Sequence, residues 1–253
     1  MYEFYARSET GPFRKKNDDS FLINNIVSNK SLHKRINKFT DKNRREFTLA
    51  VADGVGGRKG GDFASNFILE ELVNIHKVDH IPTVLEKINL LNRKLIKEAS
   101  INSFTGASST LTLMTSLNEF ITIYHIGDTR AYKLTPTKLV QLTEDQTKLQ
   151  KTINELPFFN PVKSLLPDNN ILLNAMGISE DLINIDVSKT TIEPSDILLL
   201  TSDGVHDYLS EGEIESILRQ YKSPKTIVNK LISKAIKNGS TDNLTCLCTI
   251  FIN

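Results

Sequence analysis

The sequence is poor in cysteine, with only Cys246 and Cys248, which lie two residues apart in an apolar run near the C-terminus. Alternate residues of a strand point to one face, and this spacing is unsuited to a disulfide between the two. We therefore expect both thiols to fill the core, as in a protein of a reducing compartment. Cysteine and histidine spacings typical of zinc sites are absent as well.

An excess of charge is also absent, because 31 Lys and Arg residues face 30 Asp and Glu residues. This balance gives no support to a nucleic-acid or membrane partner. No apolar run approaches membrane-spanning length, and the first residues lack the apolar core of a signal peptide. We expect a cytoplasmic monomer with neither nucleic-acid nor membrane partners.

The composition is that of an ordinary folded protein, with 39% hydrophobic and 24% charged residues. Its 253 residues suffice for one large domain or two small ones, and no internal repeat is visible. Residues 28–46 are polar and basic. They could bind nucleic acid, but they have almost no aromatic residues and lie between two predicted strands, which favours a solvated loop.

The hydrophobic pattern alternates between runs of strand length and runs with helical period. Strands are predicted at residues 2–8, 20–27, 47–53, 109–117, 119–126, 130–134, 138–142, 185–193, 196–203 and 244–252. Helices are predicted at residues 62–75 and 83–100, with two more across 211–237, whereas 144–180 reads as irregular. Closely spaced strands with tight turns indicate antiparallel pairing, so the pattern favours an α+β layered sandwich over a doubly wound sheet.

Aspartates recur where predicted strands end or in the turns beside them. They are Asp18, Asp19, Asp53, Asp128, Asp203 and Asp242. Strand ends can converge at one rim of a sandwich, and carboxylates brought together there repel one another unless a positive charge lies among them. A set of oxygen ligands suits Mg²⁺ or Mn²⁺ rather than zinc.

The Gly-rich stretch GVGGRKGG after Asp53 has two other interpretations, because a strand, a Gly-rich loop and a helix also outline nucleotide-binding sites. A P-loop needs Lys and then Ser or Thr after its last glycine, but Gly61 is followed by Asp62. A dinucleotide fingerprint needs a third glycine where the sequence has Lys59. Neither interpretation fits.

Seven segments resemble, in order, the motifs of the metal-dependent protein phosphatases of type 2C, particularly their compact bacterial members. They are TGPFRKKNDDS, VADGVGGRKGGDFAS, GASSTLTLM, HIGDTRAYKL, LVQLTEDQT, LLLTSDGVHD and GSTDNLTCL. A single such segment would be weak support, whereas seven in the family's order make a specific match. The resemblance implies one domain over residues 1–253, an α+β β-sandwich of two antiparallel sheets flanked by pairs of helices, with a small flap at about 144–176.

The resemblance also implies roles for particular residues. Asp53 would bridge two Mn²⁺ or Mg²⁺ ions with help from the Gly54 carbonyl, and Asp203 and Asp242 would complete one metal's shell. Asp18 and Asp19 would hold metal-bound waters. Asp128, with Asp203, matches the position of a third, looser metal site, and Arg14 would bind the substrate phosphate with its planar guanidinium.

The mechanism implied is hydrolysis of phosphoserine or phosphothreonine by a hydroxide shared between two ions about 3.5–4 Å apart. The substrate would be a phosphoprotein made by a serine/threonine kinase. Two positions depart from the family pattern: Asp18 replaces the usual Glu or Gln, and Val55 stands where animal members have His. A catalytically weak pseudophosphatase that binds phosphoproteins is the alternative, and loss of a core aspartate would favour it.

Overall fold

The computed structural model describes residues 2–27, 46–55, 60–73, 75, 80–117, 119–155, 171–181 and 183–251. Most of the basic segment 28–46 therefore lies outside the described residues. So do residues 156–170 of the predicted flap, which include its three prolines.

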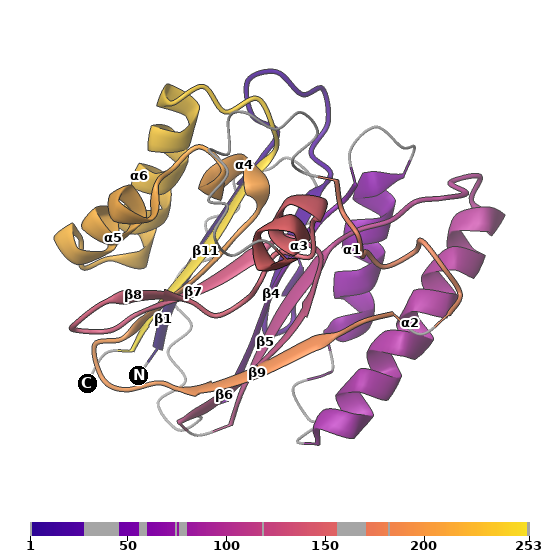
Figure 1. Ribbon diagram of the computed structural model, residues 1–253, viewed down its shortest axis with the longest axis horizontal. Coiled ribbons are helices and arrows are strands. Elements are labelled where there is room, and N and C mark those ends of the chain that lie inside the picture. The colour runs from indigo at the N-terminus through magenta and orange to yellow at the C-terminus, as the bar shows by residue number, and fades with distance from the viewer. Residues whose placement is uncertain are drawn as a thin grey trace.

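Two antiparallel sheets form the centre of the molecule (Figure 1). The first sheet has the order β1 (Tyr2–Glu9), β11 (Leu244–Phe251), β10 (Ile197–Thr201), β7 (Arg130–Leu134) and β8 (Leu139–Gln141). The second has the order β3 (Ile26–Val27), β2 (Asp19–Ile23), β4 (Phe47–Asp53), β5 (Leu111–Leu117), β6 (Phe120–Ile126) and β9 (Asp186–Thr191). Every pairing between neighbouring strands is antiparallel.

A pair of helices covers the outer face of each sheet (Figure 1). The helices α1 (Gly61–Leu72) and α2 (Ile81–Ile101) lie on the second sheet, and α5 (Glu211–Gln220) and α6 (Pro224–Lys237) lie on the first. Two shorter helices, α3 (Lys148–Glu155) and α4 (Asp203–His206), lie near the ends of the strands. The predicted α+β sandwich flanked by helix pairs is confirmed.

Three apolar clusters separate the layers. One lies between α1, α2 and the second sheet, another between α5, α6 and the first sheet, and the third between the two sheets. The thiols of Cys246 and Cys248 are unbridged and buried in the second of these clusters, as predicted. The strand ends are thus held by a rigid core on both sides.

The structure corrects two predicted segments. Residues 20–27 form a hairpin of β2 and β3 rather than one strand, because Asn24 adopts a left-handed φ of 55° that its short polar side chain tolerates. Within 144–180, predicted to be irregular, residues 148–155 form α3. This helix buries only Leu149, so it lacks the apolar stripe that the prediction relied on.

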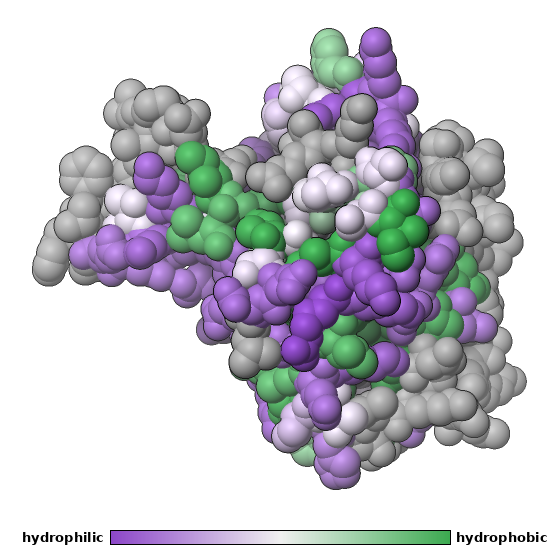
Figure 2. Space-filling view, turned by 90° about the vertical axis from the view of Figure 1, so that its right-hand side faces the viewer, coloured by the Kyte–Doolittle hydropathy of each residue, from purple (hydrophilic) through white to green (hydrophobic). Residues whose placement is uncertain are grey.

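The face around α2 carries apolar side chains as separate groups among charged ones (Figure 2). Leu90 and Ile101 of α2 are among them, with 61% and 65% of their surface exposed. Isolated exposed apolar residues of this kind are common on folded proteins. Among the described residues, no helix is both long and apolar enough to span a bilayer.

Candidate metal-binding active site

The predicted aspartates lie close together at one end of the sandwich. Asp53 ends β4, Asp203 follows β10, Asp242 precedes β11, and Asp128 lies in the turn from β6 to β7. A cavity of about 370 Å³ between them is lined by Arg14, Asp18, Asp53, Gly54, Val55, Thr110, Asp128, Leu172, Asp203, Asp242 and Asn243. Of the predicted site residues, Asp19 alone does not line this cavity. Their individual roles remain predictions.

The backbone at Gly54 runs so close to neighbouring chain that no larger residue fits. A Cβ atom there would lie 2.3 Å from the carbonyl oxygen of Gly61 and 2.7 Å from that of Asp18. The Gly54 amide donates a 3.1 Å hydrogen bond to that same Asp18 carbonyl. Glycine is therefore required by this close approach, which brings the start of α1 against the metal-site strands.

Asp53 is held by hydroxyl groups of the neighbouring chain. Its backbone amide donates to Thr110 Oγ1 at 3.0 Å, and its carbonyl accepts from Ser109 Oγ at 2.9 Å. Burial, followed by repulsion from Asp19 and Asp203, raises the pKa of the Asp53 carboxyl well above its ordinary value. The strand end is thus held in place, and the charge of Arg14 offsets only part of the repulsion at its carboxylate.

Asp19 lies directly opposite Asp53 in the pairing of β2 with β4. Its Oδ2 atom accepts a 2.7 Å hydrogen bond from Ser202 Oγ, but its Oδ1 atom is buried and receives none. Burial raises the pKa of Asp19 to about 6. An unpaired carboxylate oxygen at this depth is costly unless a cation compensates for it.

Asp203 and Asp128 also have raised pKa values, although the charge of Arg130 opposes the shift at Asp128. Burial and the charge of Asp128 raise the pKa of Asp203 well above its ordinary value, and its Oδ1 atom has no hydrogen-bond partner. Burial, Asp145 and Asp207 raise the pKa of Asp128 to about 7.

Asp207 was missed in the sequence, although it follows Asp203 by four residues. That spacing corresponds to about one helical turn. Its carboxylate contributes to raising the pKa of both Asp128 and Asp203. The repeated Asp in SDGVHD was therefore the available signal that a second carboxylate approaches the site.

Arg14 also lines the cavity, where it pairs with Asp242. Its Nη2 atom donates a 2.6 Å hydrogen bond to Oδ2 of Asp242. The loop that carries Arg14 is fixed by Asn243, whose Nδ2 atom donates to the carbonyls of Thr10 and Lys16, both at 2.8 Å. Asn243 Oδ1 also accepts from the Asp18 amide at 2.9 Å. No local pattern points to Asn243, because its partners lie more than 200 positions away in the chain.

Asp18 links the cavity to α1. Its Oδ1 atom accepts a 3.1 Å hydrogen bond from the Asp62 amide in the first turn of that helix. The helix has no side-chain cap at Gly60, so Asp18 satisfies a free amide of the first turn from outside. This contact uses one carboxylate oxygen and leaves the other available.

These residues fit hard divalent cations. The site is built from carboxylate oxygens, and Asp19 and Asp203 each bury an oxygen without a hydrogen-bond partner. In the described part of the chain, no three acidic, histidine or cysteine side chains already form a closed set of metal ligands. Binding would therefore require the carboxylates to turn towards the ions.

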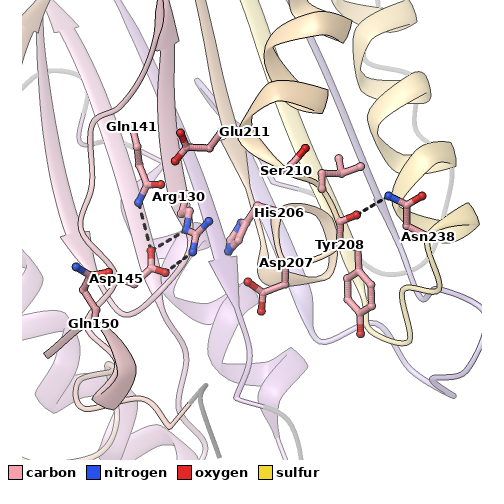
Figure 3. Close-up of a pocket in the computed structure, with 11 residues that line it drawn as sticks. Arg130, Gln141, Asp145, Gln150, His206, Asp207, Tyr208, Ser210, Glu211 and Asn238 are labelled. Carbon is pink, nitrogen blue, oxygen red and sulfur yellow. Dashed lines mark hydrogen bonds and ion pairs between the residues drawn. The ribbon is translucent and has the colours of Figure 1, made fainter. Parts of the chain in front are cut away.

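A second, polar cleft of about 680 Å³ lies beside the carboxylates (Figure 3). Arg130 pairs with Asp145, with Nε donating to Oδ1 at 2.8 Å; in the view of Figure 3 Glu211 lies above this pair, and Asp207 lies on the other side of His206. His206 also lines the cleft, and its Nδ1 atom lies 2.9 Å from Thr201 Oγ1. Its side chain is nearly buried, so its surroundings give it a packing role.

Comparison with known proteins agrees with this fold. The family described as "Protein phosphatase 2C" matches residues 33–238. The serine/threonine phosphatase stp of Listeria welshimeri is 31% identical over 218 residues, covering 83% of this chain and 86% of that protein.

Solved structures agree as well. Serine/threonine phosphatase Stp1 from Staphylococcus aureus has a TM-score of 0.83 at 24% identity, covering 100% of this chain and 96% of that one. The catalytic domain of the serine/threonine protein phosphatase PstP, in complex with two manganese ions, has a TM-score of 0.77 at 24% identity, covering 100% and 99%.

This chain therefore shares the fold of two sheets flanked by helix pairs with solved phosphatases. The sequence matches show more than a shared fold. The family matches residues 33–238, and a relative that is 31% identical matches 83% of this chain. The chain belongs to the protein phosphatase 2C family.

Proposed function

We propose that this protein is a metal-dependent serine/threonine protein phosphatase. The observation that carries the proposal is the pair of buried, unpartnered carboxylate oxygens on Asp19 and Asp203, beside the raised pKa values of Asp53 and Asp128. Such a group of charges is best explained as a site for divalent cations. The serine/threonine phosphatase names of the relatives, and the manganese ions of the PstP structure, support the same activity.

Asp53, the Gly54 carbonyl, Asp203 and Asp242 would hold two Mn²⁺ or Mg²⁺ ions. Asp18 and Asp19 would take part through water, and Asp128 with Asp203 would hold a possible third ion. When bound, the ions supply an activated water at neutral pH and offset charge on the phosphoryl oxygens.

The chain's own contribution begins with Arg14, which lies at the cavity edge with 41% of its side chain exposed. A guanidinium can turn from Asp242 to a phosphate and grip two of its oxygens. Asn243 fixes the loop that carries it, so the grip is positioned before the substrate arrives. The substrate residues on either side of the phosphorylated residue can bind in the polar cleft of Figure 3.

The test is hydrolysis of matched phosphothreonine and phosphotyrosine peptides, with and without Mn²⁺. We expect Mn²⁺-dependent phosphate release from the phosphothreonine peptide, and much slower release from the phosphotyrosine peptide. Binding of the phosphothreonine peptide without hydrolysis, at saturating Mn²⁺, would instead support the pseudophosphatase.

The biological setting is also part of the proposal. The substrates are phosphoproteins made by an opposing serine/threonine kinase, and the protein acts as a monomer in the cytoplasm. Residues 1–253 form a single catalytic domain, in agreement with a family match that runs from 33 to 238. Sedimentation of the purified protein tests the monomer directly.

A further inference from the structure

A buried histidine, His125, lies three residues before Asp128 and is not one of the proposed metal ligands. It sits in β6 with 1% of its surface exposed. Both of its ring nitrogens have partners, since Nδ1 lies 2.9 Å from Thr112 Oγ1 and Nε2 lies 2.9 Å from the Glu144 carbonyl oxygen. The two partners belong to different parts of the site.

The chemistry of these partners assigns the protons. A carbonyl oxygen can only accept, so Nε2 of His125 carries the hydrogen and donates to Glu144. Burial lowers the pKa of the imidazole, against the opposing charges of Asp145 and Asp186, which favours the neutral ring. Nδ1 is then an acceptor facing the Thr112 hydroxyl, whose single hydrogen lies within reach of both Nδ1 and the Thr129 carbonyl oxygen, each 2.9 Å from Oγ1.

Thr112 carries this contact to the turn that holds Asp128. Thr112 Oγ1 lies 2.9 Å from the Thr129 carbonyl oxygen, to which it can donate, and 2.7 Å from Thr129 Oγ1, so it contacts Thr129 whichever acceptor takes its hydrogen. Thr129 is the residue after Asp128. On its other side the turn packs on Thr110, because a Cβ atom at Gly127 would lie only 2.6 Å from Thr110 Cγ2.

Glu144 carries the second contact to the chain that enters the flap. Two residues later, the Gln146 amide donates to the Gly127 carbonyl at 2.7 Å, and the Gly127 amide donates to Gln146 Oε1 at 2.8 Å. The flap entry and the Asp128 turn are thus joined by the Gly127–Gln146 hydrogen bonds, by the Arg130–Asp145 ion pair and by the imidazole.

We infer that His125 is a positioning residue, which holds the Asp128 turn and the flap entry together as one unit. Only the consequence of this inference rests on the proposed function: the Asp128 carboxylate stays directed at Asp203 and the metal ions. His125 does not touch the substrate or the carboxylates in this role. A side chain that merely fills the space would remove this contact and leave the Gly127–Gln146 hydrogen bonds and the Arg130–Asp145 ion pair to hold the two segments alone.

The experiment measures amide hydrogen exchange by NMR in the metal-free protein, for His125→Leu, which fills the space without hydrogen bonds. We expect exchange at Gly127 and Gln146 to accelerate roughly tenfold, as for the loss of a buried hydrogen bond. His125→Gln can retain a donor towards Glu144, so exchange at Gln146 should be partly restored. Tyr124→Phe is the matched control. Tyr124 lies next to His125 in β6, and the substitution removes a hydroxyl that bonds to Thr115 of β5.

A second readout separates positioning from general destabilisation. In His125→Leu, the Mn²⁺ concentration for half-maximal hydrolysis of p-nitrophenyl phosphate should rise, whereas KM for that substrate stays within about twofold. Tyr124→Phe should change neither. If His125→Leu does not fold, Thr112→Val removes one hydroxyl at nearly constant shape and should accelerate exchange at Gly127.

Wild-type exchange at both amides in a folded His125→Leu protein, or at Gly127 in Thr112→Val, would overturn the inference. In either case His125 would only fill the core. A wild-type protein without any phosphatase activity would refute the proposed function, but it would leave the exchange measurement valid.

Discussion

Asp19 and Asp53 face each other across the paired strands β2 and β4, with both carboxyl groups buried at the same end of the sandwich. Antiparallel pairing places directly opposite residues about 5 Å apart, which is unfavourable for two like charges. A cation would therefore be stabilised at the paired ends of β2 and β4. This relationship accounts for the raised pKa values and for the predicted response to metal ions.

Stability of the metal-free protein should fall as pH rises. The folded-state pKa values of Asp19, about 6, and Asp128, about 7, lie above the ordinary value of about 4. Protonation therefore favours the folded state: the contribution is complete below about pH 4 and is lost as pH passes through these values. Thermal unfolding in EDTA should show a lower Tm at pH 8 than at pH 5.5.

Mn²⁺ should reverse this trend, because the ions bind the ionised carboxylates. The rise in Tm caused by Mn²⁺ should be larger at pH 8 than at pH 5.5. An equal rise at both pH values would show that the ions bind elsewhere than at these carboxylates.

Replacement of Arg14 by alanine should weaken substrate binding. If Arg14 grips the phosphate, Arg14→Ala should raise KM for p-nitrophenyl phosphate roughly tenfold, and Arg14→Lys should recover only part of this loss. Mn²⁺ affinity, measured by calorimetry, should not fall, because the guanidinium is a competing cation beside Asp242. An unchanged KM in the alanine variant would leave Arg14 with only a structural role.

Substitution of a predicted metal-binding aspartate should lower activity without unfolding the protein. Asn at position 53, 203 or 242 keeps the side-chain shape but removes a charged ligand, so kcat should fall roughly 100-fold or more. For Asp203→Asn, the metal-free protein should unfold at the same temperature as wild type or higher, because one buried charge among like charges is gone. Near wild-type turnover of Asp203→Asn at saturating Mn²⁺ would contradict its assignment.

Gly54→Ala tests the close approach of the backbone. Its Cβ atom would lie 2.3 Å from the Gly61 carbonyl, so the free energy of unfolding should fall by about 2 kcal/mol through overpacking. Gly212→Ala in α5 is the control, since nothing lies within 4 Å of its added Cβ atom. Urea denaturation of both variants measures the difference, and equal stability would show that the Gly54 backbone yields without cost.

The layers, and the position of the aspartates at one end of the sandwich, could be predicted from the sequence for one physical reason. Buried strands carry strong apolar runs, and each aspartate lies where such a run ends, as Asp53 does after β4 and Asp203 after β10. These are local features of the chain.

Other features could not be predicted, because they depend on contacts between distant segments. Asn243 binds Thr10 and Lys16 across the chain, and His125 joins Thr112 to Glu144. Neither side chain has a distinctive local pattern. The helix α3 was missed for a different reason, since it exposes most of its surface and so lacks a clear apolar period.

The most direct test of the account is hydrolysis of p-nitrophenyl phosphate by the purified protein, first with Mn²⁺ and then after addition of excess EDTA. The account predicts hydrolysis with Mn²⁺, loss of activity in EDTA, and recovery when Mn²⁺ is restored in excess of the chelator. Asp203→Asn prepared in parallel should remain inactive under all three conditions. Full activity of the wild-type protein in EDTA would contradict the metal-dependent mechanism.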